Sequence, residues 1–268
     1  MENKIDVSVI LPIKSASNRD FDELFDKAIT SLKTQKVSIN ELVIVHTDDE
    51  KLVNHINDYD FGDLNVKKLT WKKEPNYSKQ INYGVENSAS EWVSFFEYDD
   101  EYASIWFSNV KKYTDIYKKV DAFLPIVIDI DSKGVFAGFT NEASFAANFT
   151  SEIGMLSNET LLNYQNFQTS GMVIRKESFE KYGKFKPSMK LTFVYEFLLR
   201  MTYNSVNIMT IPKIGYKHLN LREGSIFWNY KNGSDILTQD EVKFWIESAK
   251  KEHFFTTDRQ IKYELQTI

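Results

Sequence analysis

The chain has 268 residues and a net charge of −5 at neutral pH, with 20 Phe, 14 Tyr and no Cys. This length fits one large domain or two small ones and suffices for a substantial core, and the aromatic content is typical of a folded globular protein. The lack of Cys excludes disulfide bonds, thiolate zinc sites and cysteine nucleophiles. The acidic balance argues against a protein that coats nucleic acid through bulk charge.

No segment of the sequence approaches the roughly 18 to 20 consecutive apolar residues of a membrane-spanning helix. The apolar run in MENKIDVSVILPIK is too short and too soon interrupted for a signal peptide. We therefore expect a soluble, cytoplasmic protein.

The first hundred residues alternate strand patterns with helix patterns. Four segments have the apolar, β-branched composition of strands: 7–13, 41–45, 65–70 and 92–96. Two segments between them have helical spacing: 21–32 and 78–89. Asp20 and Glu23 have the spacing of a capping box for the first helix. This alternation is typical of a parallel sheet with helical crossovers, in which ligands bind at the carboxyl ends of the strands.

The second half is less regular. Further helices are predicted at 103–119, 193–203 and 239–252, and further strands at 121–128, 170–175 and 207–211. Residues 132–157 lack a clear period, and we interpret them as loops and short strands. No internal repeat, low-complexity linker or sharp domain break is visible in the sequence.

Four acids follow the strand at 92–96 within five residues: Glu97, Asp99, Asp100 and Glu101. Carboxylates this close repel each other, and at the end of a buried strand they favour a divalent cation. Mg²⁺ and Mn²⁺ prefer oxygen ligands and share their coordination sphere with substrate phosphates. The alternative is an acidic turn that is simply solvated.

The order of these segments, together with five motifs, resembles the family-two glycosyltransferases of the GT-A fold over about residues 7–225. VSVILPIK is similar to the family's opening strand, and SLKTQ followed by ELVIV is similar to its SLxxQ…EIIIV. The stretch NYSKQINYGVENSASEWVSFFEYDD resembles the family's N-x-G…N-x-G…D-x-D-D region. SGMVIRKESFEKYGKF and GYKHLNLREGS resemble two segments from the end of the family's domain.

The resemblance implies an α/β fold of GT-A type, with a Rossmann-like mixed, mostly parallel sheet flanked by helices. It implies a glycosyltransferase domain at 1–225, divided into a nucleotide-sugar-binding half at 1–102 and an acceptor-binding half at 103–225. We expect residues 226–268 to form a C-terminal helical extension packed on the same domain.

The implied activity is transfer of a sugar from a nucleotide-sugar, most often UDP-linked, to an acceptor hydroxyl with inversion. The implied cofactor is Mn²⁺ or Mg²⁺, because the leaving diphosphate carries negative charge that a metal ion neutralises. The acceptor class stays open between a glycan, a glycolipid, a protein and a modified nucleic acid.

The motif also assigns residues to the metal. Glu97 stands at the first acid and is expected to contact the ribose or the metal, whereas Asp99 is the principal expected metal ligand. Asp100 is the next expected ligand. His218 is expected to complete the set, with a packed or surface histidine as an equal alternative.

The remaining donor contacts are expected from residues at strand ends and in the matched motifs. These residues are Pro12, Lys14, Asp48, Asp49, Asn76, Asn82, Glu97, Asp99 and Arg222. Arg222 suits forked recognition of phosphate oxygens, and a loop salt bridge is its alternative. A solvated lysine is an equally good interpretation of Lys14.

The sequence departs from the family pattern after the second strand. The family's V-D-D-G-S, whose Asp contacts the nucleotide base, is replaced by Val45-His46-Thr47-Asp48-Asp49. The acids are displaced by two positions, so we expect either Asp48 or Asp49 to contact the base.

A second departure concerns the catalytic base. The family places it in an E-D pair before a helix, and alignment on Arg200 puts Phe193 and Val194 at that pair. Val cannot accept a proton. Glu196 lies two positions later and is our candidate base, provided that it reaches the acceptor hydroxyl within about 3 Å. The alternative is a helix pair with Arg200 at i,i+4, or a supporting role.

Two other functions stay open. A binding or assembly protein that kept the fold but lost turnover is favoured by the missing E-D acids and disfavoured by the intact acid run. A nucleotidyltransferase needs a Gly-rich phosphate loop after the first strand, and KSASNRD contains no Gly.

Aromatic residues are more numerous than a core of this size requires. We expect most of the following to pack in the core and some to form a stacking surface for a sugar: Trp71, Trp106, Phe136, Phe139, Phe145, Phe149, Trp228 and Tyr230.

Overall fold

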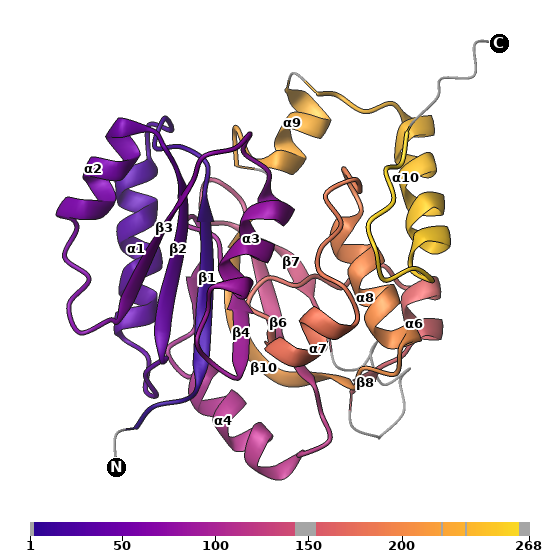
Figure 1. Cartoon of the computed structure of the whole chain (residues 1–268), viewed down its shortest axis with the longest axis horizontal. Helices are drawn as coiled ribbons and strands as arrows, with labels where there is room; N and C mark the ends of the chain where they lie inside the picture. Colours follow the sequence, from indigo (N-terminus) through magenta and orange to yellow (C-terminus); the bar gives the residue numbers. More distant parts are fainter. Residues whose placement is uncertain (1–2, 143–153, 221, 234, 263–268) are drawn as a thin grey trace.

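The computed structural model describes residues 3–142, 154–220, 222–233 and 235–262, and Figure 1 shows its helices and strands. The strands are β1 (Val7–Ile13), β2 (Glu41–Thr47), β3 (Val66–Trp71), β4 (Trp92–Phe95), β5 (Glu101–Tyr102), β6 (Ala122–Ile130), β7 (Phe136–Thr140), β8 (Met155–Leu156), β9 (Val173–Arg175) and β10 (Ile208–Leu219). The helices are α1 (Phe21–Lys33), α2 (Glu50–Asp58), α3 (Tyr77–Glu86), α4 (Trp106–Ile116), α6 (Asn158–Asn163), α7 (Lys176–Lys181), α8 (Phe193–Tyr203), α9 (Ile226–Asn232) and α10 (Gln239–Glu252).

All these strands belong to one mixed sheet in the order β3-β2-β1-β4-β9-β6-β10-β5, with β7 beside β6 and β8 beside β10. The N-terminal strands β3, β2, β1 and β4 are parallel, as the alternating pattern predicted. β1 and β2 are buried along their whole length, which explains their continuous apolar runs. β9 is antiparallel to both of its neighbours.

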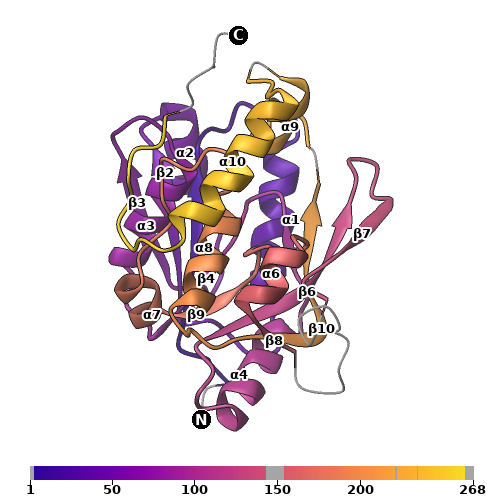
Figure 2. The same ribbon diagram turned by 90° about the vertical axis from the view of Figure 1, so that its right-hand side faces the viewer.

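Helices cover both faces of the sheet (Figures 1 and 2). One apolar core joins the sheet to α1, α2 and α4, and the other joins it to α3, α6, α7, α8 and α10. The carboxyl ends of β1, β2 and β3 all lie at the end of the molecule that also carries α9 (Figure 1). In a parallel sheet this is the end where ligands bind.

Strand β10 is much longer than the predicted segment at 207–211. It has twelve residues, and its pairing with β6 is irregular between Ile211 and Tyr216. This irregularity interrupts the alternation of apolar and polar residues from which the strand was predicted, so the prediction ended at residue 211. The second half of β10 carries His218 to the sheet edge at which β4 ends.

Other local predictions differ from the structure. The side chain of Asp20 makes no cap hydrogen bond to α1, so the predicted capping box is wrong. Helix α2 was not predicted, because only Leu52 and Ile56 of its nine residues are buried and leave a weak period. The six-residue α6 and α7 were missed because they are too short to repeat an apolar stripe. The seven-residue α9 lies within 226–268, which we expected to be helical, but no helix was predicted at its own residues.

The C-terminal segment packs on α8 through α10. Trp245 of α10 lies in the same core as Phe197 and Leu198 of α8. The hydroxyl of Thr192, before α8, donates to the Trp245 carbonyl at 2.8 Å. Helix α10 begins with a capping box between Thr238 and Glu241.

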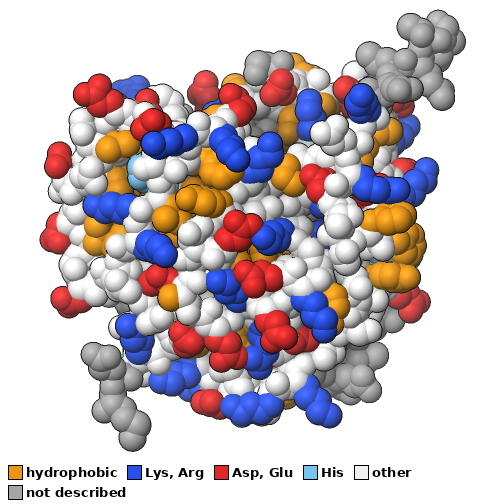
Figure 3. Space-filling model, viewed as in Figure 1, with side chains coloured by type: hydrophobic (Ala, Val, Ile, Leu, Met, Phe, Trp, Pro, Cys, Tyr) orange, Lys and Arg blue, Asp and Glu red, His pale blue; other side chains and the backbone are white. Residues whose placement is uncertain are grey.

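The surface carries charges of both signs. Figure 3 shows acidic and basic side chains interspersed over the face that it draws. Among the helices that the structure describes, none has both the length and the apolar character needed to cross a bilayer.

A Gly84→Ala substitution is expected to lower the free energy of unfolding by about 1–3 kcal/mol, because it overpacks the contact of α3 with the sheet. A Cβ at Gly84 would overlap the Cγ2 methyl of Ile10 and lie 3.0 Å from that of Val45. Urea denaturation measures the change. Gly138→Ala is the matched control, since no described atom lies within 4 Å of its added Cβ. Equal stability of Gly84→Ala and wild type would contradict this packing.

Candidate functional site

The acid run turns the chain at the carboxyl end of β4. After Phe96 the chain reverses, and the short strand β5 pairs antiparallel with β10, Glu101 opposite Lys217 and Tyr102 opposite Tyr216. This pairing places His218 beside Asp100. Lys217 pairs with Glu101, so Glu101 is engaged in an ion pair on the strand rather than with the other acids.

Asp100 is the buried centre of the site, with only 1% of its surface exposed. Its carboxylate accepts the backbone N–H of Leu219 at 2.9 Å and lies 3.1 Å from Nδ1 of His218. Glu97, Asp100 and His218 each offer a ligand atom, and these atoms lie within 4.8 Å of one another. This grouping supports the prediction that Glu97, Asp100 and His218 lie at one site.

The electrostatics of this group suit a cation. Burial, followed by the charge of Asp100, raises the pKa of Glu97 to about 8. Burial lowers the pKa of His218, but the charge of Asp100 and the hydrogen bond to it outweigh this effect and raise it to about 10. A proton on His218 thus balances the buried carboxylates, and a metal ion would compete for the same place. Two carboxylates and one imidazole fit a divalent cation as a donor set.

Asp99 lies next to this group but has a different partner. Nε of Arg222 donates to its carboxylate, and the guanidinium carbon lies 5.1 Å from the centre of the Tyr98 ring. Burial and Asp100 raise the pKa of Asp99, whereas Arg222 opposes that shift. The salt-bridge alternative for Arg222 is therefore realised, and its cation neutralises the residue expected to be the principal metal ligand.

The ends of β1 and β2 place the next predicted donor residues. The hydroxyl of Thr47 donates to the Lys14 carbonyl at 2.7 Å, which joins the two strand ends. The Lys14 and Asp48 side chains are exposed there. Asp49 instead caps α2 by accepting the N–H of Leu52 at 2.8 Å. Pro12 is buried inside β1, opposite Val45, and offers backbone only.

The two predicted asparagines have partners within the protein. Asn76 caps α3 by accepting the N–H of Lys79 at 3.0 Å. Asn82 donates to the Phe185 carbonyl at 2.8 Å and accepts the Phe185 N–H at 3.1 Å. Both polar atoms of Asn82 are thus used to hold the loop before α8.

The sequence matches the family model described as Glycosyl transferase family 2 over residues 8–183. The chain belongs to glycosyl transferase family 2. No curated protein matched the sequence. The family assignment decides against the nucleotidyltransferase alternative.

Solved structures share the fold. The chain is similar to S. aureus TarS 1–349 in complex with UDP-GlcNAc, with a TM-score of 0.65 and 16% identity over 96% of this chain and 68% of that one. It is also similar to S. aureus TarS 1–349 alone, with a TM-score of 0.59 and 17% identity over 93% of this chain and 72% of that one. The protein has the GT-A fold that the sequence predicted, with a mixed, mostly parallel sheet between helices.

In this family 2 protein, the predicted catalytic residue Glu196 is completely buried. One carboxylate oxygen accepts from Nε of Arg200 at 2.8 Å and lies 2.9 Å from Nζ of Lys186. The other accepts from Nη2 of Arg200 at 2.9 Å. An acceptor hydroxyl has to come within about 3 Å of a base. Both carboxylate oxygens of Glu196 are already engaged by Arg200 and Lys186, so no hydroxyl can approach them. A buried ion pair with Arg200 therefore replaces the interpretation of Glu196 as the base.

This ion pair extends to the C-terminal segment. Lys186, only 1% exposed, also donates to the Glu252 carbonyl at 2.7 Å. Arg200 uses its remaining N–H groups on the carbonyls of the loop before α8, including Tyr182 at 2.7 Å and Lys184 at 2.9 Å. The cluster thus ties α8, this loop and α10 together.

The start of α8, where the family places its E-D pair, presents an aromatic ring. Phe193 is buried, and its ring centroid lies 5.6 Å from that of Tyr77. Burial and then the charge of Glu97 raise the pKa of Tyr77 well above its usual value. The first two positions of α8 therefore offer no carboxylate, and the only acid in its first turn is Glu196.

The sequence reasoning missed Asp129, near the end of β6. Asp129 lies opposite His218 of β10 and is only 8% exposed, and burial raises its pKa. The sequence did contain an indication of this residue, because Asp129 is an acid within the apolar run of β6, close to the carboxyl end of the strand. The run was instead interpreted as a strand ending one residue earlier.

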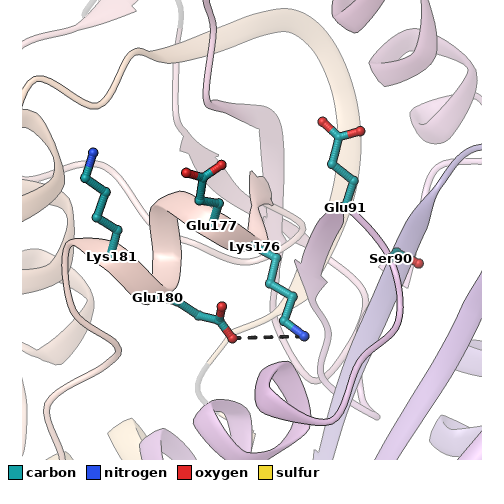
Figure 4. A pocket seen from close by; sticks show the side chains of 6 residues that line it. All are labelled: Ser90, Glu91, Lys176, Glu177, Glu180 and Lys181. Carbon is teal, nitrogen blue, oxygen red and sulfur yellow. Dashed lines mark ion pairs between the residues drawn. The ribbon is translucent and has the colours of Figure 1, made fainter.

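A hollow at the other end of β4 carries no comparable arrangement (Figure 4). It is lined by Ser90, Glu91, Lys176, Glu177, Glu180 and Lys181. Lys176 and Glu180 form an ion pair at 4.0 Å, and Glu91 pairs with Arg175. Ser90 and Glu91 precede β4, so this hollow lies at the amino end of the strand, away from the ligand-binding edge.

Proposed function

We propose that this protein is a metal-dependent glycosyltransferase that moves a sugar from a UDP-sugar to an acceptor hydroxyl with inversion. The proposal rests on one observation: the side chains of Glu97, Asp100 and His218 lie close together at the carboxyl end of β4 in a family 2 chain. The complex of the similar TarS structure with UDP-GlcNAc supports UDP as the nucleotide.

The proposed donor site extends from these three ligands to the ends of β1 and β2. When bound, Mn²⁺ or Mg²⁺ would offset the charge that develops on the leaving diphosphate. Asp48, exposed after β2, is proposed to contact the base, and Lys14, exposed after β1, the phosphates. Asp49 and Asn76 cap the helices that frame the site, and Asn82 holds the loop before α8.

Arg222 is proposed to exchange Asp99 for a phosphate oxygen when the donor binds. Its guanidinium already lies beside the acid turn, and a forked cation is well matched to a diphosphate. The exchange would free Asp99 to join the metal ligands, as the family motif implies.

An Arg222→Met substitution is therefore expected to weaken UDP affinity about 10- to 100-fold at saturating Mn²⁺, the usual cost of losing a hydrogen bond to a charged group. Isothermal titration calorimetry measures this affinity. Lys217→Met is the control, because Lys217 pairs with Glu101 on the strand. Unchanged UDP affinity in Arg222→Met would contradict the proposed exchange.

The direct test of the function is release of the nucleotide. The protein is incubated with Mn²⁺ and a panel of UDP-sugars, and free UDP is measured together with the anomeric configuration of any product. We expect UDP release from one conjugate, abolished by EDTA, and an inverted product once an acceptor is present. A retained anomeric configuration or metal-independent release would contradict the proposal.

One observation favours the binding-protein alternative. The start of α8 carries Phe193 and Val194 in place of two acids, and Glu196 is sequestered by Arg200 and Lys186. Metal-dependent UDP binding without release from any conjugate, with every acceptor class tried, would support that alternative.

A further inference from the structure

Helix α3 begins over the carboxyl ends of β1 and β2. The side-chain amide of Gln80 donates to the carbonyl of Ile13, the last residue of β1, at 3.3 Å and to that of Val45 in β2 at 3.2 Å. Tyr77 is the first residue of α3 and lies three positions before Gln80, so the two side chains are neighbours on one face of the helix. Tyr77 is therefore placed at the ligand-binding end of the sheet, where α3 begins (Figure 1).

Tyr77 lies near two parts of the candidate site. Its ring packs on Phe193, the first residue of α8, with the ring centroids 5.6 Å apart. Burial, followed by the charges of Glu97, Asp100 and Asp99, raises the pKa of its phenol, so the phenol is also close to the acids that follow β4. Tyr77 thus borders both the proposed metal site and the helix start at which the family places its base.

The hydroxyl of Tyr77 has no hydrogen-bond partner among the described residues, although its side chain is partly buried. The hydroxyls of the other tyrosines near the acids are bonded within the protein: Tyr98 to Asn18, Tyr102 to Ser94 and Tyr216 to the Glu97 N–H. A tyrosine hydroxyl in such surroundings usually has a partner. Because the raised pKa keeps the phenol of Tyr77 neutral, its O–H is available to donate a hydrogen bond to a ligand.

The place of the transferred sugar follows from the proposed reaction. The group of Glu97, Asp100 and His218 is the proposed site of the diphosphate. In an inverting transfer, the acceptor hydroxyl attacks the sugar carbon from the side opposite to the leaving diphosphate. The family places the base for that hydroxyl at the start of α8, and a base acts within about 3 Å of the proton it takes. The sugar therefore lies between the metal group and the start of α8, the two parts of the site that Tyr77 borders.

The aromatic residues predicted to stack on a sugar did not include Tyr77. Of those residues, Trp106 is buried in the core, and Phe145 and Phe149 lie outside the described residues. Phe136 and Phe139 are exposed on β7, the outer strand of the hairpin with β6. The sequence singled out Asn76 in the same motif, but the placement of its neighbour Tyr77 depends on the packing of α3 against α8.

We propose that Tyr77 binds the sugar of the nucleotide-sugar donor by donating a hydrogen bond from its hydroxyl to an oxygen atom of that sugar. Phe193 supports the ring of Tyr77 and so fixes the direction of the hydroxyl. A neutral donor suits a sugar oxygen, which carries no charge of its own. This inference rests on the proposed function and adds to it a residue that distinguishes the nucleotide-sugar from the bare nucleotide.

The test is a Tyr77→Phe substitution, which removes the hydroxyl and keeps the ring on Phe193. Isothermal titration calorimetry with the full chain at saturating Mn²⁺, without an acceptor, measures the affinities for UDP and for a panel of UDP-sugars. We expect Tyr77→Phe to weaken the UDP-sugar that the wild type binds most tightly by about tenfold, the usual cost of one neutral hydrogen bond. The affinity for UDP is expected to stay the same. Tyr195→Phe is the matched control, because the Tyr195 hydroxyl donates to the Leu161 carbonyl at 3.1 Å.

The comparison of UDP with the UDP-sugar separates this inference from the proposed function. A loss of UDP-sugar affinity alone in Tyr77→Phe, with both affinities kept in Tyr195→Phe, supports the role of Tyr77. An equal loss of both affinities places the hydroxyl on the nucleotide and overturns the inference. Unchanged affinities in Tyr77→Phe, or a wild type that binds UDP but no UDP-sugar, also overturn it. A wild type that does not bind UDP with Mn²⁺ refutes the proposed function itself.

Discussion

An Asp100→Asn substitution is expected to abolish the stabilisation that UDP with Mn²⁺ gives to the folded protein. Asp100 is the buried member of the metal group, and its ligand atom lies within 4.8 Å of those of Glu97 and His218. Replacing residues that merely support a metal ligand already costs about 10- to 100-fold in metal affinity, so loss of a ligand costs more. The Asn side chain still accepts the Leu219 N–H, so the turn is expected to keep its conformation.

Differential scanning fluorimetry with and without EDTA measures this effect. Glu101→Gln is the matched control, because Glu101 belongs to the same acid run but pairs with Lys217 on the strand. We expect Glu101→Gln to keep the metal-dependent shift. A full shift in Asp100→Asn would place the metal elsewhere and remove the basis of the proposed donor site.

A Glu196→Gln substitution is expected to lower the free energy of unfolding by about 3–5 kcal/mol, the usual cost of breaking a buried ion pair from one side. The change leaves two buried cations, on Arg200 and Lys186, with less compensation. Because Lys186 also contacts Glu252, the loss is expected to loosen the contact between α8 and α10.

Urea denaturation measures the stability, and Glu247→Gln is the control. Glu247 forms an exposed ion pair with Lys250 on α10, and such pairs contribute about 0–1 kcal/mol. Near-wild-type stability of Glu196→Gln together with lost turnover would return Glu196 to the role of base. A large loss of stability in both variants would show that α10 is generally fragile.

Much of the fold could be predicted from the sequence, because apolar periods record burial directly. The predicted limits of β1, α8 and α10 agree with the structure, and each of these elements has an uninterrupted apolar run or stripe. Strand β10 was predicted only in part, because its irregular pairing breaks the period at the point where it approaches the site.

The candidate site was harder to predict, because its geometry depends on register between distant segments. The acids were visible as a run, but only the pairing of β5 with β10 decides that Asp100 meets His218. The same register decides that Glu101 faces Lys217. The position of Asp129 beside His218 follows from the pairing of β6 with β10, which one sequence does not reveal.

The role of each charged residue also depends on the ion-pair partner that it contacts in the folded protein. Glu196 was correctly paired with Arg200 by helical spacing, yet its complete burial and its contact with Lys186 depend on the loop before α8. Arg222 and Asp99 were both assigned to the donor, and their pairing with each other could not be read from residues 123 positions apart.

Nucleotide binding by the wild-type protein tests the central claim most directly. Thermal shifts are recorded with UDP, GDP, CMP and dTDP, each with Mn²⁺, Mg²⁺ or EDTA. At a hundred times its Kd a ligand stabilises the fold by about 2.7 kcal/mol, which is easily detected. We predict a shift with UDP that requires the metal. No metal-dependent shift with any of the four nucleotides would contradict the account.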